Sequence, residues 1–409
     1  MARRYRCPLV LGSATPSPRP STAAAAARIR RHLDARRDAR APGTRSPADG
    51  SHCRPAPRVR TRQPLHVLKT ADGGLERVVE RREKAVLLHN RRGFAPFLMC
   101  RECGCVPTCN HCSTALTYHE RTHTLQCHTC GSSGACSRIR AHESLPQVRQ
   151  PLPGKNGSGY QQIEDALHQM LPEDVAIIRM DADSTRGKDA HKKLLEQFDA
   201  ADCAVLLGTQ MIAKGLDFPE VTLVGVVNAD FALKLPDFRA GERAYDLLEQ
   251  VAGRAGRGDR PGEVIIQTYL PDDPVIRAVA EHDRSIFTDY DLDQRRDALY
   301  PPFVRLVNIL VWSTNAGDAR DYIGRIAKLL KRRWHAAAPD FLRAGSAVPQ
   351  VLGPASCVIE RAKDRYRFHL LVKSPVGYHV SDDIDACLKE VGSVRGVSVS
   401  VDVDAYDLM

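Results

Sequence analysis

Short apolar runs alternate with amphipathic helical patterns along the middle of the chain. The runs are rich in valine, isoleucine and leucine and predict buried strands at 84–90, 174–181, 202–209, 221–230 and 262–269. Apolar residues that recur every three or four positions predict helices at 159–171, 190–200 and 242–252. Buried strands separated by amphipathic helices are typical of a mostly parallel sheet with helices on both faces. The pattern therefore predicts an α/β fold for the segments 74–98 and 154–275.

The pattern changes near residue 293, after which strand, helix, strand, helix and strand follow in turn. This order predicts a separate α+β domain over 293–409, with the prolines of "LYPPF" marking the boundary. The strand runs of this domain carry no catalytic constellation. Its four clustered cations form either a solvated edge or a contact with DNA: Arg361, Lys363, Arg365 and Arg367.

Residues 16–63 differ in composition, with 12 arginines, 10 alanines and 7 prolines but only three larger aliphatic residues. So little apolar surface cannot offset the entropy that ordering the chain would cost. We therefore expect residues 18–73 to form a disordered basic segment, either a solvated tail or a non-specific DNA-binding arm. The segment also holds most of the formal net charge of +10, so the basic balance says little about the folded part.

No apolar run approaches the length of about 20 residues that a membrane span requires. The opening "MARRYRCPLV" has too short an apolar part for a signal peptide. We therefore expect a cytoplasmic protein that is not bound to a membrane.

The spacing of cysteines predicts a metal site. Six of the 13 cysteines form three C-x2-C pairs: Cys100/Cys103, Cys109/Cys112 and Cys127/Cys130. Each such turn aims two thiolates at one point, and two turns complete a tetrahedral zinc site. The residues between the second and third pairs, "STALTYHERTHTLQ", alternate as in a β-hairpin. We predict structural zinc at these two pairs, since a complete shell of four thiolates leaves no open position for catalysis.

The pair Cys100 and Cys103 has no second C-x2-C pair to complete it. Downstream of the predicted site the nearest candidates are Cys136 and His142. These four residues form either an intact second Zn²⁺ site or, as the missing pair favours, a damaged or weak one. The predicted zinc-binding insertion covers residues 99–153.

The candidate binding loops follow the strands, because loops at the carboxyl ends of parallel strands collect binding groups. One loop begins after the run that ends at Leu207 and contributes small or polar residues: Gly208, Thr209, Gln210, Lys214, Gly215 and Asp217. Such residues can approach a backbone or a phosphate closely.

A second candidate loop, "QVAGRAGRG", opens from the helix predicted at 242–252 and contains Gln250, Arg254 and Arg257. The two arginines are three residues apart, and we expect them to share one face of a helix-to-loop turn. A guanidinium group matches phosphate oxygens in two-point geometry and stays charged. Spacing alone leaves two alternatives open, namely phosphate ligands and solvated arginines.

Four stretches of the sequence resemble one protein family. The stretch "LGTQMIAKGLDFPEVTLVGVVNADFALKLPDFRAGERAYDLLEQVAGRAGRG" resembles the second motor lobe of the PriA family of replication-restart helicases (primosomal protein N′) in superfamily 2. The stretch "LLHNRRGFAPFLMCRECGC" with the cysteine pairs resembles the family's zinc-binding insertion, and "LVLGSATPS" resembles the end of its first motor lobe. The stretches "LGPASCVIERAKDRYRFHLLVK" and "VDVDAYDL" resemble its C-terminal domain. The resemblance covers residues 8–17 and 75–409.

The resemblance implies a RecA-like second helicase lobe that carries the zinc insertion and is followed by the C-terminal domain. It places Gln250, Arg254 and Arg257 in the nucleotide cleft, with Arg257 as the arginine finger at the γ-phosphate of ATP. It implies a 3′ to 5′ DNA helicase that binds branched DNA and restarts stalled replication forks. The implied partners are primosome and single-stranded-DNA-binding proteins, and the zinc module would touch both DNA and proteins.

The resemblance also implies residues that couple nucleotide state to DNA movement. In the second lobe these are Gly208, Thr209, Gln210 and Gly215. Between the lobes the coupling motif matches Ser13, Ala14 and Thr15, within a remnant of the first lobe at residues 1–17.

The residues that would grip ATP are missing from the sequence. A motor of this kind needs the phosphate loop G-x-x-x-x-G-K-[ST] and an acidic motif for Mg²⁺ and the attacking water. The candidate "LPGKNGSG" has Asn156 after Gly154 and Lys155, and "RGKD" fails in the same way. We therefore expect ATP and Mg²⁺ to bind only if a first lobe is supplied, and no unwinding by this chain alone.

Two segments depart from the family pattern, and we hypothesise that the gene has undergone frame changes around residues 18–73 and 131–159. Codons for "LPQVRQ" can be chosen that, read one base later, encode Cys-Pro-Lys-Cys-Gly, a zinc knuckle in the expected place. A merely divergent second site without zinc is the alternative. The nucleotide sequence tests the hypothesis directly.

Two functions of different classes follow. One is an ATP-dependent DNA helicase, or a fragment of one, that needs a first lobe. The other is a non-catalytic, zinc-containing DNA-binding adaptor for primosome assembly.

Overall fold

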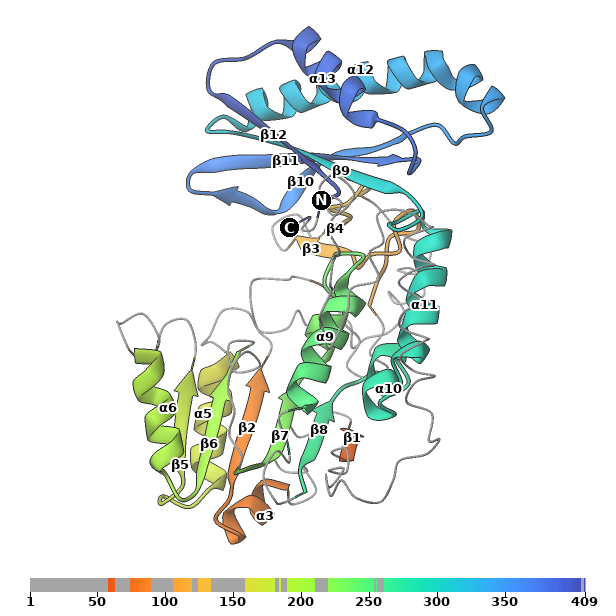
Figure 1. Ribbon diagram of the computed structural model, residues 1–409. Coiled ribbons are helices and arrows are strands. Elements are labelled where there is room, and N and C mark those ends of the chain that lie inside the picture. The colour runs from red at the N-terminus through yellow and green to blue at the C-terminus, as the bar shows by residue number, and fades with distance from the viewer. Residues whose placement is uncertain are drawn as a thin grey trace, which may run out of the picture. The chain divides into compact units, whose positions relative to one another are not determined.

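The computed structural model describes residues 58–62, 74–89, 97, 106–119, 124–133, 159–180, 184, 190–209, 220–253, 255, 261–405 and 408. These residues form two main sheets, one parallel and one antiparallel, and a small two-stranded hairpin (Figure 1). None of the helices in these ranges combines the length and the hydropathy needed to cross a lipid bilayer.

The parallel sheet and its helices take up most of the chain before residue 300. Its strands are β1 (Arg58–Arg62), β2 (Lys84–His89), β5 (Ala176–Met180), β6 (Ala204–Gly208), β7 (Val221–Val227) and β8 (Glu263–Gln267). Its helices are α3 (Gly74–Glu80), α5 (Gly159–Met170), α6 (Ala190–Ala200), α8 (Asp230–Leu233), α9 (Ala240–Ala252), α10 (Pro274–Ala280) and α11 (Arg284–Asp297). Every strand and helix predicted from the sequence in this region is present, which confirms the α/β fold.

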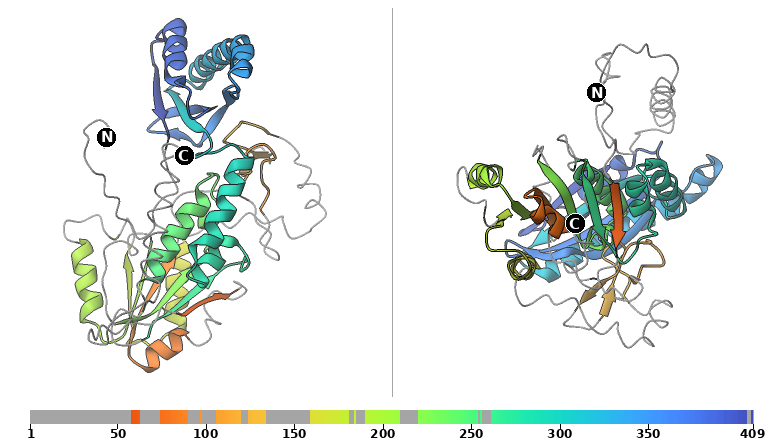
Figure 2. Two further views of the ribbon diagram at one scale, coloured as in Figure 1. Left: turned by 45° about the vertical axis from the view of Figure 1, so that its right-hand side comes forward. Right: turned by 90° about the horizontal axis from the view of Figure 1, so that it is seen from below.

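The six strands are all parallel and lie in the order β1-β8-β7-β2-β6-β5. The central strands β2, β6 and β7 are buried along their whole length, as expected for a sheet covered on both faces. One face packs against α6, α9, α10 and the start of α11, and the other against α3 and α5. Figure 2 shows α9, α10 and α11 together on the first of these faces.

Strand β1 departs from the expectation of disorder for residues 18–73. Residues 58–62 pair in parallel with β8, from Arg58 opposite Glu263 to Arg62 opposite Gln267. Composition predicts disorder because it counts apolar side chains, whereas an edge strand is held by the backbone groups of its neighbour. The rest of that segment, including residues 1–17 before it, lies outside the described residues.

The C-terminal domain is an antiparallel sheet with two helices. Its elements are β9 (Arg305–Ser313), α12 (Ala316–Arg343), β10 (Gln350–Ala362), β11 (Arg365–Ser374), α13 (Val380–Val391) and β12 (Val397–Val403). The strands lie in the order β10-β11-β9-β12, which gives the βαββαβ topology of a ferredoxin-like fold. Both helices pack on one face of the sheet (Figures 1 and 2).

Two details of this domain differ from the sequence prediction. Strand β10 was not predicted, because its residues include Gly353, Pro354 and a charged end and its pairing with β11 is interrupted by register shifts. The predicted boundary at residue 293 falls inside α11. That helix belongs with the parallel sheet, since its Phe287 lies in the core beneath α9.

Candidate functional site: a four-cysteine centre and the carboxyl edge of the parallel sheet

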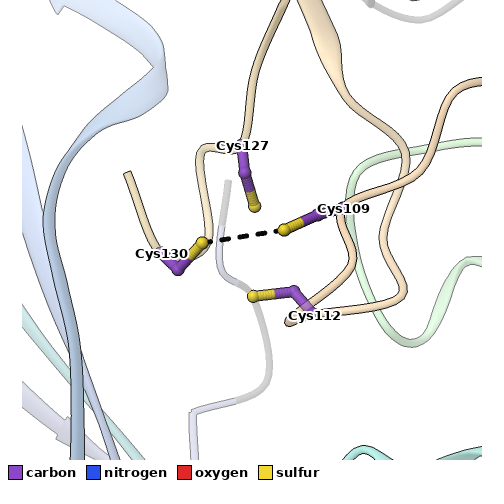
Figure 3. Close-up of side chains that lie close together, drawn as sticks. All are labelled: Cys109, Cys112, Cys127 and Cys130. Atoms are coloured by element: carbon purple, nitrogen blue, oxygen red, sulfur yellow. Dashed lines mark hydrogen bonds between the residues drawn. The ribbon is translucent and has the colours of Figure 1, made fainter. Parts of the chain in front are cut away.

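The four predicted zinc ligands meet at one point (Figure 3). The sulfur atoms of Cys109, Cys112, Cys127 and Cys130 all lie within 4.8 Å of one another. Cys109, Cys112 and Cys127 are buried and Cys130 is partly buried. The predicted hairpin between the two pairs is confirmed, because β3 (Thr117–His119) and β4 (Thr124–Gln126) pair antiparallel.

Each C-x2-C pair is shaped by the same backbone turn. In the first, the amide of Cys109 donates to the carbonyl of Thr114 at 2.8 Å, and the left-handed residue Ser113 has a φ of 53°. In the second, the amide of Cys127 donates to the carbonyl of Ser132 at 2.9 Å, and Gly131 has a φ of 77°. A left-handed residue after the second cysteine reverses the chain, so that both thiols of a pair point inward.

The arrangement fits a zinc ion. Tetrahedral Zn–S bonds of about 2.3 Å require sulfur atoms about 3.8 Å apart, and the Cys109 and Cys130 sulfurs are 3.7 Å apart. This separation is far longer than the 2.05 Å or so of a disulfide. The hydrogen bond with Cys112 lowers the pKa of the Cys109 thiol and raises that of Cys112, so without a metal the thiols share their protons unequally. A bound Zn²⁺ would hold all four as thiolates and would serve structure, not catalysis.

The turns around the four cysteines, which we call the zinc module (residues 106–133), contact the C-terminal sheet. The Tyr300 hydroxyl donates to the carbonyl of Cys112 at 3.3 Å. The Nδ1 of His128 lies 2.8 Å from the carbonyl of Ser356 in β10, and the Nε2 of His369 in β11 donates to the carbonyl of His128. A Cβ atom at Gly131 would lie 2.9 Å from the carbonyl of Pro354, so only glycine fits there. The zinc module is therefore seated on the sheet face opposite α12 and α13.

The contact of His369 predicts a pH-dependent stability. Burial lowers the pKa of His369 to about 4, because its Nδ1 has no partner and a second proton would be unsolvated. The ordinary histidine pKa is about 6.5, so the folded state loses about 3 kcal/mol as the pH falls from 6.5 through 4. We expect His369→Gln, which can still donate to His128, to reduce the acid sensitivity of the unfolding temperature between pH 7.5 and 5. The exposed His335→Gln is the control, and equal acid sensitivity of both variants would contradict the assignment.

A second set of polar residues lies at the carboxyl edge of the parallel sheet. His89 ends β2, Thr209 follows β6, Asn228 follows β7 and Gln267 ends β8. These strands are neighbours, and the register places Leu88 beside Gly208 and His89 beside Val227. The four residues therefore form a row across the edge, with His89, Thr209 and Gln267 buried. We call this row the polar edge.

The predicted coupling residues Gly208 and Thr209 lie on this polar edge, whereas Gln210 and Gly215 lie outside the described residues. The sequence interpretation missed His89, Asn228 and Gln267. Their signal was their position at strand ends, and it could have been read together with the loops.

The described part of "QVAGRAGRG" ends helix α9. Gln250 lies partly buried in its last turn, and α9 ends at Ala252. The argument that Arg254 and Arg257 share a helical face does not hold, because both follow the end of the helix. Their side chains lie outside the described residues, as do Ser13, Ala14, Thr15, Cys100, Cys103, Cys136 and His142. The second zinc site and the residues of the first lobe therefore remain predictions from the sequence.

Sequence spacing also missed a buried cluster where α9, α11 and the C-terminal domain meet. Arg295 bonds to Glu242 at 2.9 Å and to Asp291 at 2.8 Å. The rings of Phe238 and Tyr300 stack with their centroids 4.5 Å apart. This cluster links the helix that ends at Gln250 to the tyrosine that contacts Cys112.

Three family models match the chain. The model of the PriA DNA helicase Cys-rich region (CRR) domain matches residues 109–133. The helicase conserved C-terminal domain matches residues 158–259, and the primosomal protein N C-terminal domain matches residues 296–406. The segment between the first two matches contains most of the second region of hypothesised frame change. The described residues Gly131 and Ser132 at its start belong to an intact turn of the zinc module.

Curated relatives agree with these models. Replication restart protein PriA of Bacillus subtilis (strain 168) is 38% identical over 346 residues, which are 82% of this chain and 40% of that protein. The protein of the same name from Synechocystis is 38% identical over 83% of this chain and 39% of the relative. That of Treponema pallidum (strain Nichols) is 36% identical over 98% of this chain and 57% of the relative. The chain thus spans between 39% and 57% of the length of these relatives, and it belongs to the PriA family of replication restart proteins.

Proposed function

We propose that this chain is the DNA-handling and nucleotide-sensing part of a 3′ to 5′ DNA helicase that restarts stalled replication forks. The observation that carries the proposal is the polar edge, where Thr209 lies in line with His89, Asn228 and Gln267 across four neighbouring strands. Ligands of open α/β sheets bind at this edge. The loop that begins at Thr209 opens from the same edge, as expected of a loop that couples nucleotide state to DNA movement.

The chemistry we propose for the arginine motif is electrostatic. Arg254 and Arg257 follow α9 and would face the γ-phosphate of ATP across a cleft, where a guanidinium group stabilises the charge of the transition state. ATP and Mg²⁺ themselves would be gripped by a phosphate loop, which the 409 residues of this sequence do not contain. The chain alone would then bind forked DNA in the cytoplasm without hydrolysing ATP.

The missing phosphate loop also favours a second candidate function. In that case the chain is a non-catalytic, zinc-containing adaptor that binds branched DNA and recruits primosome and single-stranded-DNA-binding proteins. The two functions differ in what a supplied first lobe would do, since only the first predicts restored turnover.

The test is ATP hydrolysis by the purified chain with forked DNA. We expect binding of the fork, weakening as salt rises because phosphate contacts release counterions. We expect no hydrolysis above the background measured without DNA. DNA-stimulated turnover would overturn the argument from the missing loop, and failure to bind forked DNA at low salt would contradict both candidate functions.

A further inference from the structure

The C-terminal sheet has two different faces. Alternate residues of β9, Val307, Ile309 and Val311, point into the core beneath α12 and α13. Because side chains alternate along a strand, Leu310 and Trp312 point to the opposite face. That face carries the zinc module, so a partly exposed indole next to it requires an explanation.

The zinc module covers only one end of this face. His369 lies opposite Leu310 in the register and is buried under the carbonyl of His128. One step further along the strands, Arg367 of β11, Trp312 of β9 and Ser398 of β12 lie side by side, and all three are partly exposed. We call these three residues the indole row. Directly opposite residues of antiparallel strands have Cβ atoms about 5 Å apart, so the row is a continuous strip across the sheet.

The strip is positively charged. Arg367 continues into Arg365 and Lys363 at the tip of the β10–β11 hairpin, and the latter two are exposed. Neither they nor Arg367 forms an ion pair within the part of the chain that the structure describes. Arg361 behaves differently, because it pairs with Asp364 at 3.0 Å. Three cations without acidic partners therefore line one end of a face that presents an indole ring.

We propose that the indole row binds an unpaired DNA strand, with a base stacked on Trp312 and the backbone phosphates held by Arg367 and Arg365. The inference rests on the proposed DNA-binding function and assigns a site to it. Flat sheets with exposed aromatic rings and flanking cations bind single strands, because every base has a face to stack. A duplex keeps its bases stacked on one another and offers no such face. The charge of the strip matches a phosphate backbone.

The two tryptophans of the chain permit a direct test. Trp334 is 2% exposed and donates to Asp383 at 2.7 Å, so Trp334→Phe leaves the fluorescence of Trp312 alone. We expect an oligothymidylate to quench this fluorescence, and an abasic strand of equal length and charge to bind without quenching. Equal quenching by both strands, or none by either, would overturn the stacking at Trp312. Quenching by an acidic peptide of equal charge would mean that the face binds a protein instead.

Affinity measurements separate this inference from the proposed function. We expect Trp312→Ala to weaken binding of a single strand by about 5- to 100-fold and Trp312→Phe to retain most of it. Arg367→Ala should lower the slope of log affinity against log salt by about 0.7. Tyr290→Ala, at a half-exposed aromatic residue on α11, is the matched control. If the chain binds forks but Trp312→Ala leaves its affinity for single strands unchanged, only the indole row is wrong. If the chain binds no DNA, the proposed function fails as well.

Discussion

Replacing Cys127 with serine is expected to abolish zinc binding at the four-cysteine centre and to release the zinc module from the C-terminal sheet. Structural zinc contributes on the order of 10 kcal/mol to the folding of small cysteine-ligated modules, and one lost thiolate leaves an incomplete shell. Without the ion, little remains to hold the module, because its own apolar core is formed mainly by the cysteines, Leu116 and Leu125. Because its turns contact Ser356, His369 and Tyr300, the loss should reach the sheet.

Two measurements check this expectation. Metal analysis of Cys127→Ser should show one equivalent of zinc less per chain than the unsubstituted protein, whether or not a second site is filled. Hydrogen exchange should accelerate in peptides covering the zinc module and residues 350–374. Cys203→Ala is the matched control, since Cys203 is also buried but lies in the core beneath α3 and α5. Unchanged zinc content in Cys127→Ser would contradict the ligand assignment.

The sequence predicts features whose determinants are local. The spacing of two C-x2-C pairs is enough to find the zinc centre, because each turn is closed by bonds within six residues of the chain. The buried strands β2, β6 and β7 read as continuous apolar runs, since both faces of a parallel sheet are covered. Strand β10 could not be found in the same way. Its interruption near Gly353 and Pro354 removes the alternation that would mark a strand.

Features that join distant parts of the chain were beyond the sequence alone. His89 and Gln267 are 178 positions apart, and only the strand order places them on one edge. The pairing of β1 with β8 likewise depends on which strand lies at the edge of the sheet. The arginine motif shows the reverse case. Its pattern was recognised at once, but helix α9 ends before Arg254, so helical spacing could not tell how the arginines are oriented.

Replacing Arg295 with methionine is expected to destabilise the protein by about 3 to 5 kcal/mol, the usual cost of breaking a buried ion pair by removing one partner. The Arg295 side chain is 3% exposed, and its partners Glu242 and Asp291 are 5% and 11% exposed. Without the guanidinium group two carboxylates would remain buried with no cation between them. Burial already raises the pKa of Asp291, and losing the arginine should raise it further.

The expected signature is a lower urea midpoint of unfolding that depends on pH. The deficit of Arg295→Met should be complete at neutral pH, where both carboxylates are ionised. It should shrink as the pH falls through their raised pKa values, because protonation removes the buried charge. Arg296→Met is the matched control. Its ion pair with Asp293 is 60% and 66% exposed, so we expect a change below about 1 kcal/mol. A deficit of equal size in the two variants, or one that does not shrink in acid, would show that the Arg295 cluster is not a buried ion pair linking α9 to α11.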